Sequence, residues 1–121
     1  MKKEQSTMIK IYHNPRCGKS RQTLALIEAA GIEPQVIEYL KTPPTAEELD
    51  SILKKLKMEP QDLMRKGEDI YRELKLEERK LSREAAIAVM VEHPKLMERP
   101  IVVKGRQAIL GRPPENVNEL L

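Results

Sequence analysis

The chain has 121 residues, enough for one compact domain, and its apolar residues are mainly aliphatic because Phe and Trp are absent. Its 22 basic and 19 acidic side chains are mixed along the sequence, so no basic stripe indicates nucleic-acid binding. The single cysteine excludes an internal disulfide, and the chain shows no signal-peptide core and no apolar run of membrane-spanning length. We therefore expect a cytoplasmic protein without membrane contact, with a polar leader over 1–7 and one domain over 8–121.

Local patterns in the first third of the chain predict a strand, a helix and a second strand. The segment 8–12 is short and apolar, and Asn14-Pro15 ends it because proline has no N–H and restricts the residue before it. The segment 18–30 carries apolar residues on one helical face, and Gly31 follows as the usual residue past a helix C-terminus. With a strand at 35–40, the order predicts a parallel βαβ unit.

The middle of the chain is predicted to be helical. Thr45, with Glu48 three residues later, forms a capping box in front of apolar residues at helical spacing. Further helical segments are predicted at 63–64, 70–76 and 82–92.

The last quarter of the chain is predicted to form a hairpin and a final helix. Strands at 101–103 and 106–110 flank Lys104-Gly105, which has the composition of a tight turn. Pro113-Pro114 then starts a helix. The complete order matches an α/β, thioredoxin-like fold in which a helical insertion separates a βαβ half from a ββα half.

The segment 13–21, HNPRCGKSR, is the candidate site because it places Cys17 between a strand and a helix. Free N–H groups and the positive end of the dipole at a helix N-terminus stabilise both a thiolate and an oxyanion. The dipole supplies about 0.3–1 kcal/mol, so we expect a cation such as Arg16 or protonated His13 to assist. A lone cysteine is often only a small buried apolar residue, but the flanking Arg16 and Gly18 favour a reactive thiol.

Several polar residues gain a functional interpretation only beside such a thiol. Ser20 is explained equally well as a helix cap and as a substrate contact, and His13 as a residue that orients the loop, tunes the thiol or ends the strand. Each arginine taken singly has the features of a surface charge, yet a guanidinium fork suits a tetrahedral oxyanion. The candidates are Arg65, Arg99 and Arg112.

Three ordered motifs carry a resemblance that covers the chain from about Met8 to its end. IYHNPRCGKSRQTL, LMRKGEDIYRELKL, and HPKLMERPIVV with GRPPE resemble the glutaredoxin-dependent arsenate reductase family. The resemblance implies that Cys17 attacks arsenate, that His13 and Ser20 support it, and that Pro100 follows a cis peptide bond. It also implies that the oxyanion is bound by Arg65, Arg99 and Arg112.

The resemblance further implies external electron donors. Glutathione is the expected co-substrate and glutaredoxin the expected partner, with no tightly bound cofactor and no metal, and a chain with one cysteine has no second thiol for internal resolution. Two alternatives remain open. One is a regulator of the Spx type that binds RNA polymerase, although such proteins usually carry Cys-x-x-Cys where this chain has Ser20; the other is a glutathione-linked reductase of a different substrate.

Overall fold

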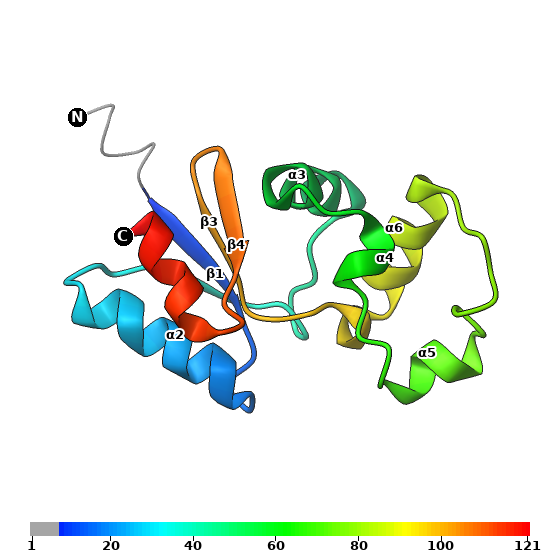
Figure 1. The fold of residues 1–121 in the computed structure, drawn as a ribbon, viewed down its shortest axis with the longest axis horizontal. Coiled ribbons are helices and arrows are strands. Elements are labelled where there is room, and N and C mark those ends of the chain that lie inside the picture. Colours follow the sequence, from blue (N-terminus) through cyan, green and yellow to red (C-terminus); the bar gives the residue numbers. More distant parts are fainter. Residues whose placement is uncertain (1–7) are drawn as a thin grey trace. The chain divides into compact units, whose positions relative to one another are not determined.

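The computed structural model describes residues 8–121, so the predicted polar leader at 1–7 lies outside the described residues. The contacts divide the chain into two compact units. Figure 1 labels most of their helices and strands. Within the described residues, the sheet unit comprises 8–42 and 99–121, and the helical unit comprises 43–98. The assignment of 8–121 to one domain stays a prediction.

The sheet unit contains a four-stranded sheet in the order β2-β1-β3-β4. Its strands are β1 (Ile9–His13), β2 (Gln35–Glu38), β3 (Ile101–Lys104) and β4 (Gln107–Leu110). β1 and β2 are parallel and are connected by α2 (Gly18–Ala29), whereas β3 is antiparallel to both β1 and β4. This topology confirms the predicted α/β arrangement of βαβ and ββα halves.

The core of the sheet unit lies between the sheet and two helices on one of its faces. α2 packs beside the final 3-10 helix η2 (Pro114–Leu120), as Figure 1 shows. Residues two apart on a strand point to the same face, so Ile9 and Ile11 both face this core. The buried cluster consists of Ile9, Ile11, Ile27, Val102, Val117 and Leu120. This packing fixes the start of α2 beside the carboxyl end of β1.

The hairpin and the last helix differ in detail from the prediction. Lys104 pairs with Gln107, so the turn is Gly105-Arg106 rather than Lys104-Gly105, and Gly105 takes a positive φ of 61° that glycine adopts without strain. The last helix has 3-10 geometry, in which residues three apart align, so Val117 and Leu120 are buried on one side.

The helical unit consists of short helices that pack against one another. They are α3 (Ala46–Leu56), α4 (Pro60–Leu63), α5 (Asp69–Glu73), α6 (Arg83–Glu92) and the 3-10 helix η1 (Pro94–Leu96). The capping box is confirmed, because Glu48 N–H donates to Thr45 Oγ1 at 3.1 Å and Thr45 N–H donates to Glu48 Oε1 at 2.8 Å. α6 packs against α3, α4 and η1.

The predicted helical conformation of Met64 is wrong. Met64 has an extended backbone (ψ 140°) and forms an isolated antiparallel bridge with Met97. Arg65 N–H donates to Leu96 O at 2.7 Å beside this bridge. A partner from a distant part of the sequence therefore overrides the local helical preference.

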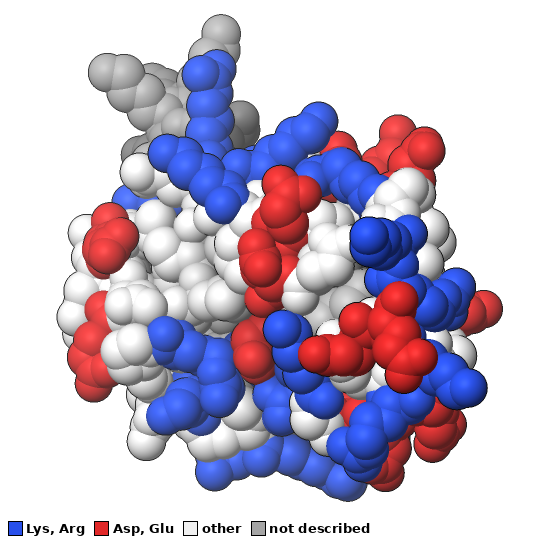
Figure 2. Space-filling view, turned by 45° about the vertical axis from the view of Figure 1, so that its right-hand side comes forward, with Lys and Arg blue, Asp and Glu red and all other residues white. Residues whose placement is uncertain are grey.

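Basic and acidic side chains are interspersed over the face drawn in Figure 2, as the mixed sequence predicted. None of the helices within 8–121 has the length and apolar character that crossing a bilayer requires.

Candidate functional site

Cys17 lies at the N-terminus of α2, as the sequence predicted. Its backbone is extended (φ −95°, ψ 123°), and its carbonyl accepts from Arg21 N–H at 3.0 Å. Asn14 closes the preceding turn, since its carbonyl accepts from Cys17 N–H and its Oδ1 accepts from Arg16 N–H, each at 3.0 Å. The turn therefore presents the thiol beside the free N–H groups of the first helical turn.

The pKa of the Cys17 thiol is lower than that of an ordinary thiol. Burial acts in the opposite direction, because a partly buried thiolate loses solvation and its pKa rises. The N–H of Ser20, the hydrogen bond and positive charge of Arg99, and the N–H of Lys19 outweigh this penalty. The helix start and one cation together favour the thiolate.

Arg99 and Arg112 flank the β3–β4 hairpin, as predicted, and Arg112 Nη1 donates to Arg99 O at 3.2 Å. The Arg99-Pro100 peptide is cis, as the resemblance implied, and so is Arg112-Pro113. Arg99 Nε is buried and meets no hydrogen-bond acceptor within residues 8–121. A buried N–H donor without an acceptor costs free energy, and an oxyanion beside the thiol would supply one.

His13 and Ser20 form a buried polar pair at the base of the loop. His13 Nδ1 lies 2.6 Å from Ser20 Oγ, which also accepts from Asn14 N–H at 3.0 Å. Burial lowers the pKa of His13, and the carboxylate of Glu38 opposes this. The ring is therefore neutral at pH 7, and its tautomer sets which partner donates in the hydrogen bond between Nδ1 and the Ser20 hydroxyl. The cation that lowers the pKa of the thiol is Arg99 rather than a protonated His13.

Arg16, the other cation suggested by the local sequence, is exposed on the loop. Its backbone N–H is held by Asn14 Oδ1, which fixes the chain but leaves the side chain at the surface. Its supporting role stays a prediction.

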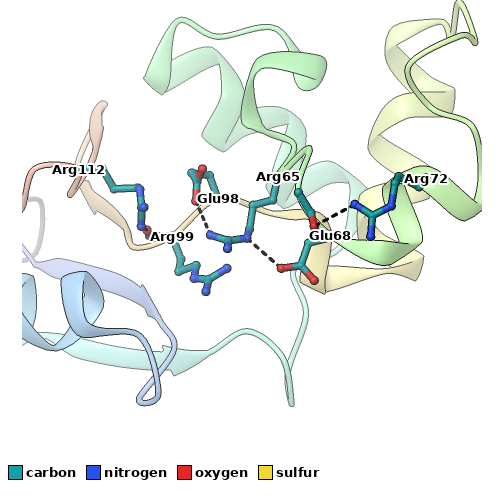
Figure 3. Close-up of polar contacts among 7 residues, drawn as sticks. Arg65, Glu68, Arg72, Glu98, Arg99 and Arg112 are labelled. Atoms are coloured by element: carbon teal, nitrogen blue, oxygen red, sulfur yellow. Dashed lines mark hydrogen bonds and ion pairs between the residues drawn. The ribbon is translucent and has the colours of Figure 1, made fainter.

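Arg65 lies in the helical unit between two carboxylates, as Figure 3 shows. Its Nε lies 3.2 Å from Glu68 Oε2 and its Nη1 lies 2.8 Å from Glu98 Oε1. Burial alone would lower the pKa of Arg65, but the charges and hydrogen bonds of Glu98 and Glu68 raise it. Arg65 thus has carboxylate acceptors of its own, whereas Arg99 Nε has none within the described chain.

Two contributors to the loop were not predicted as site residues. Asn14 was interpreted only as a strand terminator, yet its carbonyl and side chain both hold the turn. Arg21 is the last residue of the segment 13–21, and its Nη1 donates to Pro15 O at 2.9 Å. An Asn-Pro pair followed by a cation in the first turn of a helix is the signal that would have indicated both. No group of metal-ligating side chains occurs in the part of the chain that the structure describes.

Known proteins resemble this chain over nearly its whole length. A sequence model of the ArsC family matches residues 12–120. The chain is 54% identical to the uncharacterized protein YfgD of Escherichia coli over 93% of this chain and 96% of that protein. It is 45% identical to the arsenate reductase of Neisseria meningitidis over 93% and 97% of the two chains. The solved arsenate reductase from Vibrio cholerae has a TM-score of 0.91 and 53% identity, and covers 95% of this chain and 98% of its own.

Proposed function

The chain belongs to the ArsC family and has its thioredoxin-like fold, and from this premise we propose that it is a thiol-dependent arsenate reductase. Relatives named arsenate reductase match nearly the whole chain, and the match includes the loop around Cys17. In this proposal Cys17 is the nucleophile, arsenate is the substrate, and glutathione and glutaredoxin supply the electrons.

The contact between the Cys17 thiol and Arg99 carries the proposal. The thiol is held toward its anionic form by Arg99 and by two N–H groups of the first helical turn. The same guanidinium keeps a buried Nε with no acceptor in the described chain, so it can bind an oxyanion while it stabilises the thiolate. A nucleophile and an oxyanion contact on adjacent groups suit attack on a tetrahedral oxyanion.

The proposed reaction balances with two external thiols. The Cys17 thiolate forms a sulfur–arsenic bond, and one arsenate oxygen leaves as water. A glutathione thiolate then attacks the Cys17 sulfur, which breaks that bond, releases arsenite reduced by two electrons and leaves a mixed disulfide. A second glutathione, through glutaredoxin, regenerates the thiolate and yields oxidised glutathione.

The proposed roles of the other residues follow their positions. Arg112 would join Arg99 at the oxyanion, because the two arginines are linked by a hydrogen bond at the ends of the hairpin. His13 and Ser20 would support the loop through the hydrogen bond between His13 Nδ1 and Ser20 Oγ, which are 2.6 Å apart. The assignment of Arg65 to the substrate rests on the resemblance alone, and Pro100 contributes by shaping the chain after Arg99.

The test is arsenate-dependent oxidation of NADPH in the presence of glutathione, glutaredoxin and glutathione reductase. We expect turnover by the wild type, none by Cys17→Ser, and a reduced rate for Arg99→Ala with an unchanged circular dichroism spectrum. Arg106→Ala, in the exposed hairpin turn, is the matched control that removes an arginine without touching the thiol loop. A wild type without arsenate-dependent turnover, or an active Cys17→Ser, refutes the proposal.

A further inference from the structure

Arg21 lies in the first turn of α2 and reaches back across the loop that precedes the helix. Its Nη1 donates to Pro15 O at 2.9 Å. Its Nη2 lies 3.8 Å from the position that a Cβ on Gly18 would occupy, so the guanidinium passes over this residue. The contact joins the helix to the turn whose other end is Cys17.

The charge of Arg21 is poorly placed for the helix itself. Positive side chains near a helix N-terminus oppose the macrodipole, and the first turn of α2 contains no acidic residue to compensate. A residue that breaks a local rule without a compensating gain for its own helix is expected where function requires it. The bond to the Pro15 carbonyl is the gain that the structure offers.

The turn that Arg21 holds sets the position of the thiol. Asn14 fixes its start, because its carbonyl accepts from Cys17 N–H and its Oδ1 accepts from Arg16 N–H, which is the N–H side of the planar Pro15–Arg16 peptide. Arg21 holds the carbonyl side of the same peptide from the helix, so this peptide is fixed at both of its polar groups.

We propose that Arg21 is a positioning residue for Cys17, which clamps the Pro15 carbonyl so that the thiol stays aligned with the N–H groups of the helix and with Arg99. The functional part of this inference rests on the proposed reductase activity. The alignment itself does not, because it is measurable on the thiol alone.

The test compares the pH dependence of Cys17 alkylation by iodoacetamide in the wild type and in Arg21→Ala. Without the clamp the thiolate loses alignment with its donors, so we expect the alkylation midpoint to move to higher pH. Of the charged groups around the loop, Arg99 lowers the pKa of the Cys17 thiol. The charges of Glu38, Glu28 and Arg21 itself shift the pKa of His13 instead. We also expect kcat to fall about tenfold, as for one lost hydrogen bond, with little change in KM for arsenate.

Salt separates positioning from a direct effect of charge. At about 1 M salt the screening length is about 3 Å, so a long-range effect of the Arg21 charge disappears, whereas a misplaced thiol remains misplaced. The proposal is supported if the alkylation midpoint of Arg21→Ala stays above that of the wild type when both are measured at high salt. A shift that vanishes at high salt, or no shift at all, overturns it.

Gln22→Ala is the matched control, because Gln22 is the exposed neighbour of Arg21 on the same helix and the two residues have similar helix propensities. An equal midpoint shift in Gln22→Ala assigns the effect to the helix in general and overturns the proposal. An inactive wild type with a shifted midpoint in Arg21→Ala contradicts the reductase function but leaves the positioning role in place.

Discussion

Gly111→Ala tests whether the end of β4 must approach α2 as closely as the structure indicates. A Cβ on Gly111 would lie 2.4 Å from Thr23 Oγ1, 2.8 Å from Pro100 Cγ and 3.0 Å from Thr23 Cγ2. Neither neighbour can move easily, because Thr23 is fully buried with its hydroxyl bonded to Lys19 O at 2.8 Å, and Pro100 is a buried ring. Overpacking of this kind costs about 1–3 kcal/mol.

The cost converts into a measurable change in melting temperature. Unfolding entropy of about 2.1 cal/mol/K per residue gives roughly 0.25 kcal/mol/K for this chain, so Gly111→Ala should lower Tm by about 4–12 °C. Gly67→Ala is the matched control, since no atom beyond its two chain neighbours lies within 4 Å of its added Cβ and its φ is not positive. That variant should keep the wild-type Tm or raise it slightly.

A double-mutant cycle identifies the clash. Thr23→Ala removes two of the three close atoms, so Gly111→Ala should cost clearly less in that background than in the wild type. Reductase activity should also fall in Gly111→Ala, because Gly111 N–H donates to Pro100 O at 2.9 Å and Arg112 follows directly. An unchanged Tm, or the same cost in both backgrounds, would refute the close-approach reasoning.

Two further predictions concern pH and helix capping. Burial lowers the pKa of His13, so the unfolded chain binds a proton that the folded chain does not; stability should fall as pH drops below about 6.5, and urea midpoints at pH 7.5 and 5 should differ less in His13→Gln than in the wild type. Thr45→Ala removes the capping box of α3 and should cost about 0.5–2 kcal/mol by thermal melting, whereas Glu48→Gln, which keeps an acceptor for Thr45 N–H, should cost less; equal losses contradict the capping argument.

Short-range chemistry made much of the fold predictable. The capping box joins Thr45 and Glu48, which are three residues apart, and Gly31 ends its helix with a φ of 80°. Both features depend on neighbouring residues only, so the local sequence was enough to predict them. The position of Cys17 at a helix start was predictable for the same reason, because Asn14-Pro15 ends the strand in front of it. Local preference failed at Met64, where an extended partner, Met97, decided the conformation.

The sequence by itself determined that Cys17 follows a strand and begins a helix, because proline, glycine and apolar spacing act on neighbouring residues. Only the tertiary structure decided which cation activates the thiol. The local candidates were Arg16 and His13, but Arg16 is exposed and His13 is buried and neutral, whereas Arg99 comes from the other end of the sheet unit. Sheet pairing between β1 and β3 brings Arg99 beside the loop, and a contact between residues so distant in the chain depends on strand register rather than on local sequence.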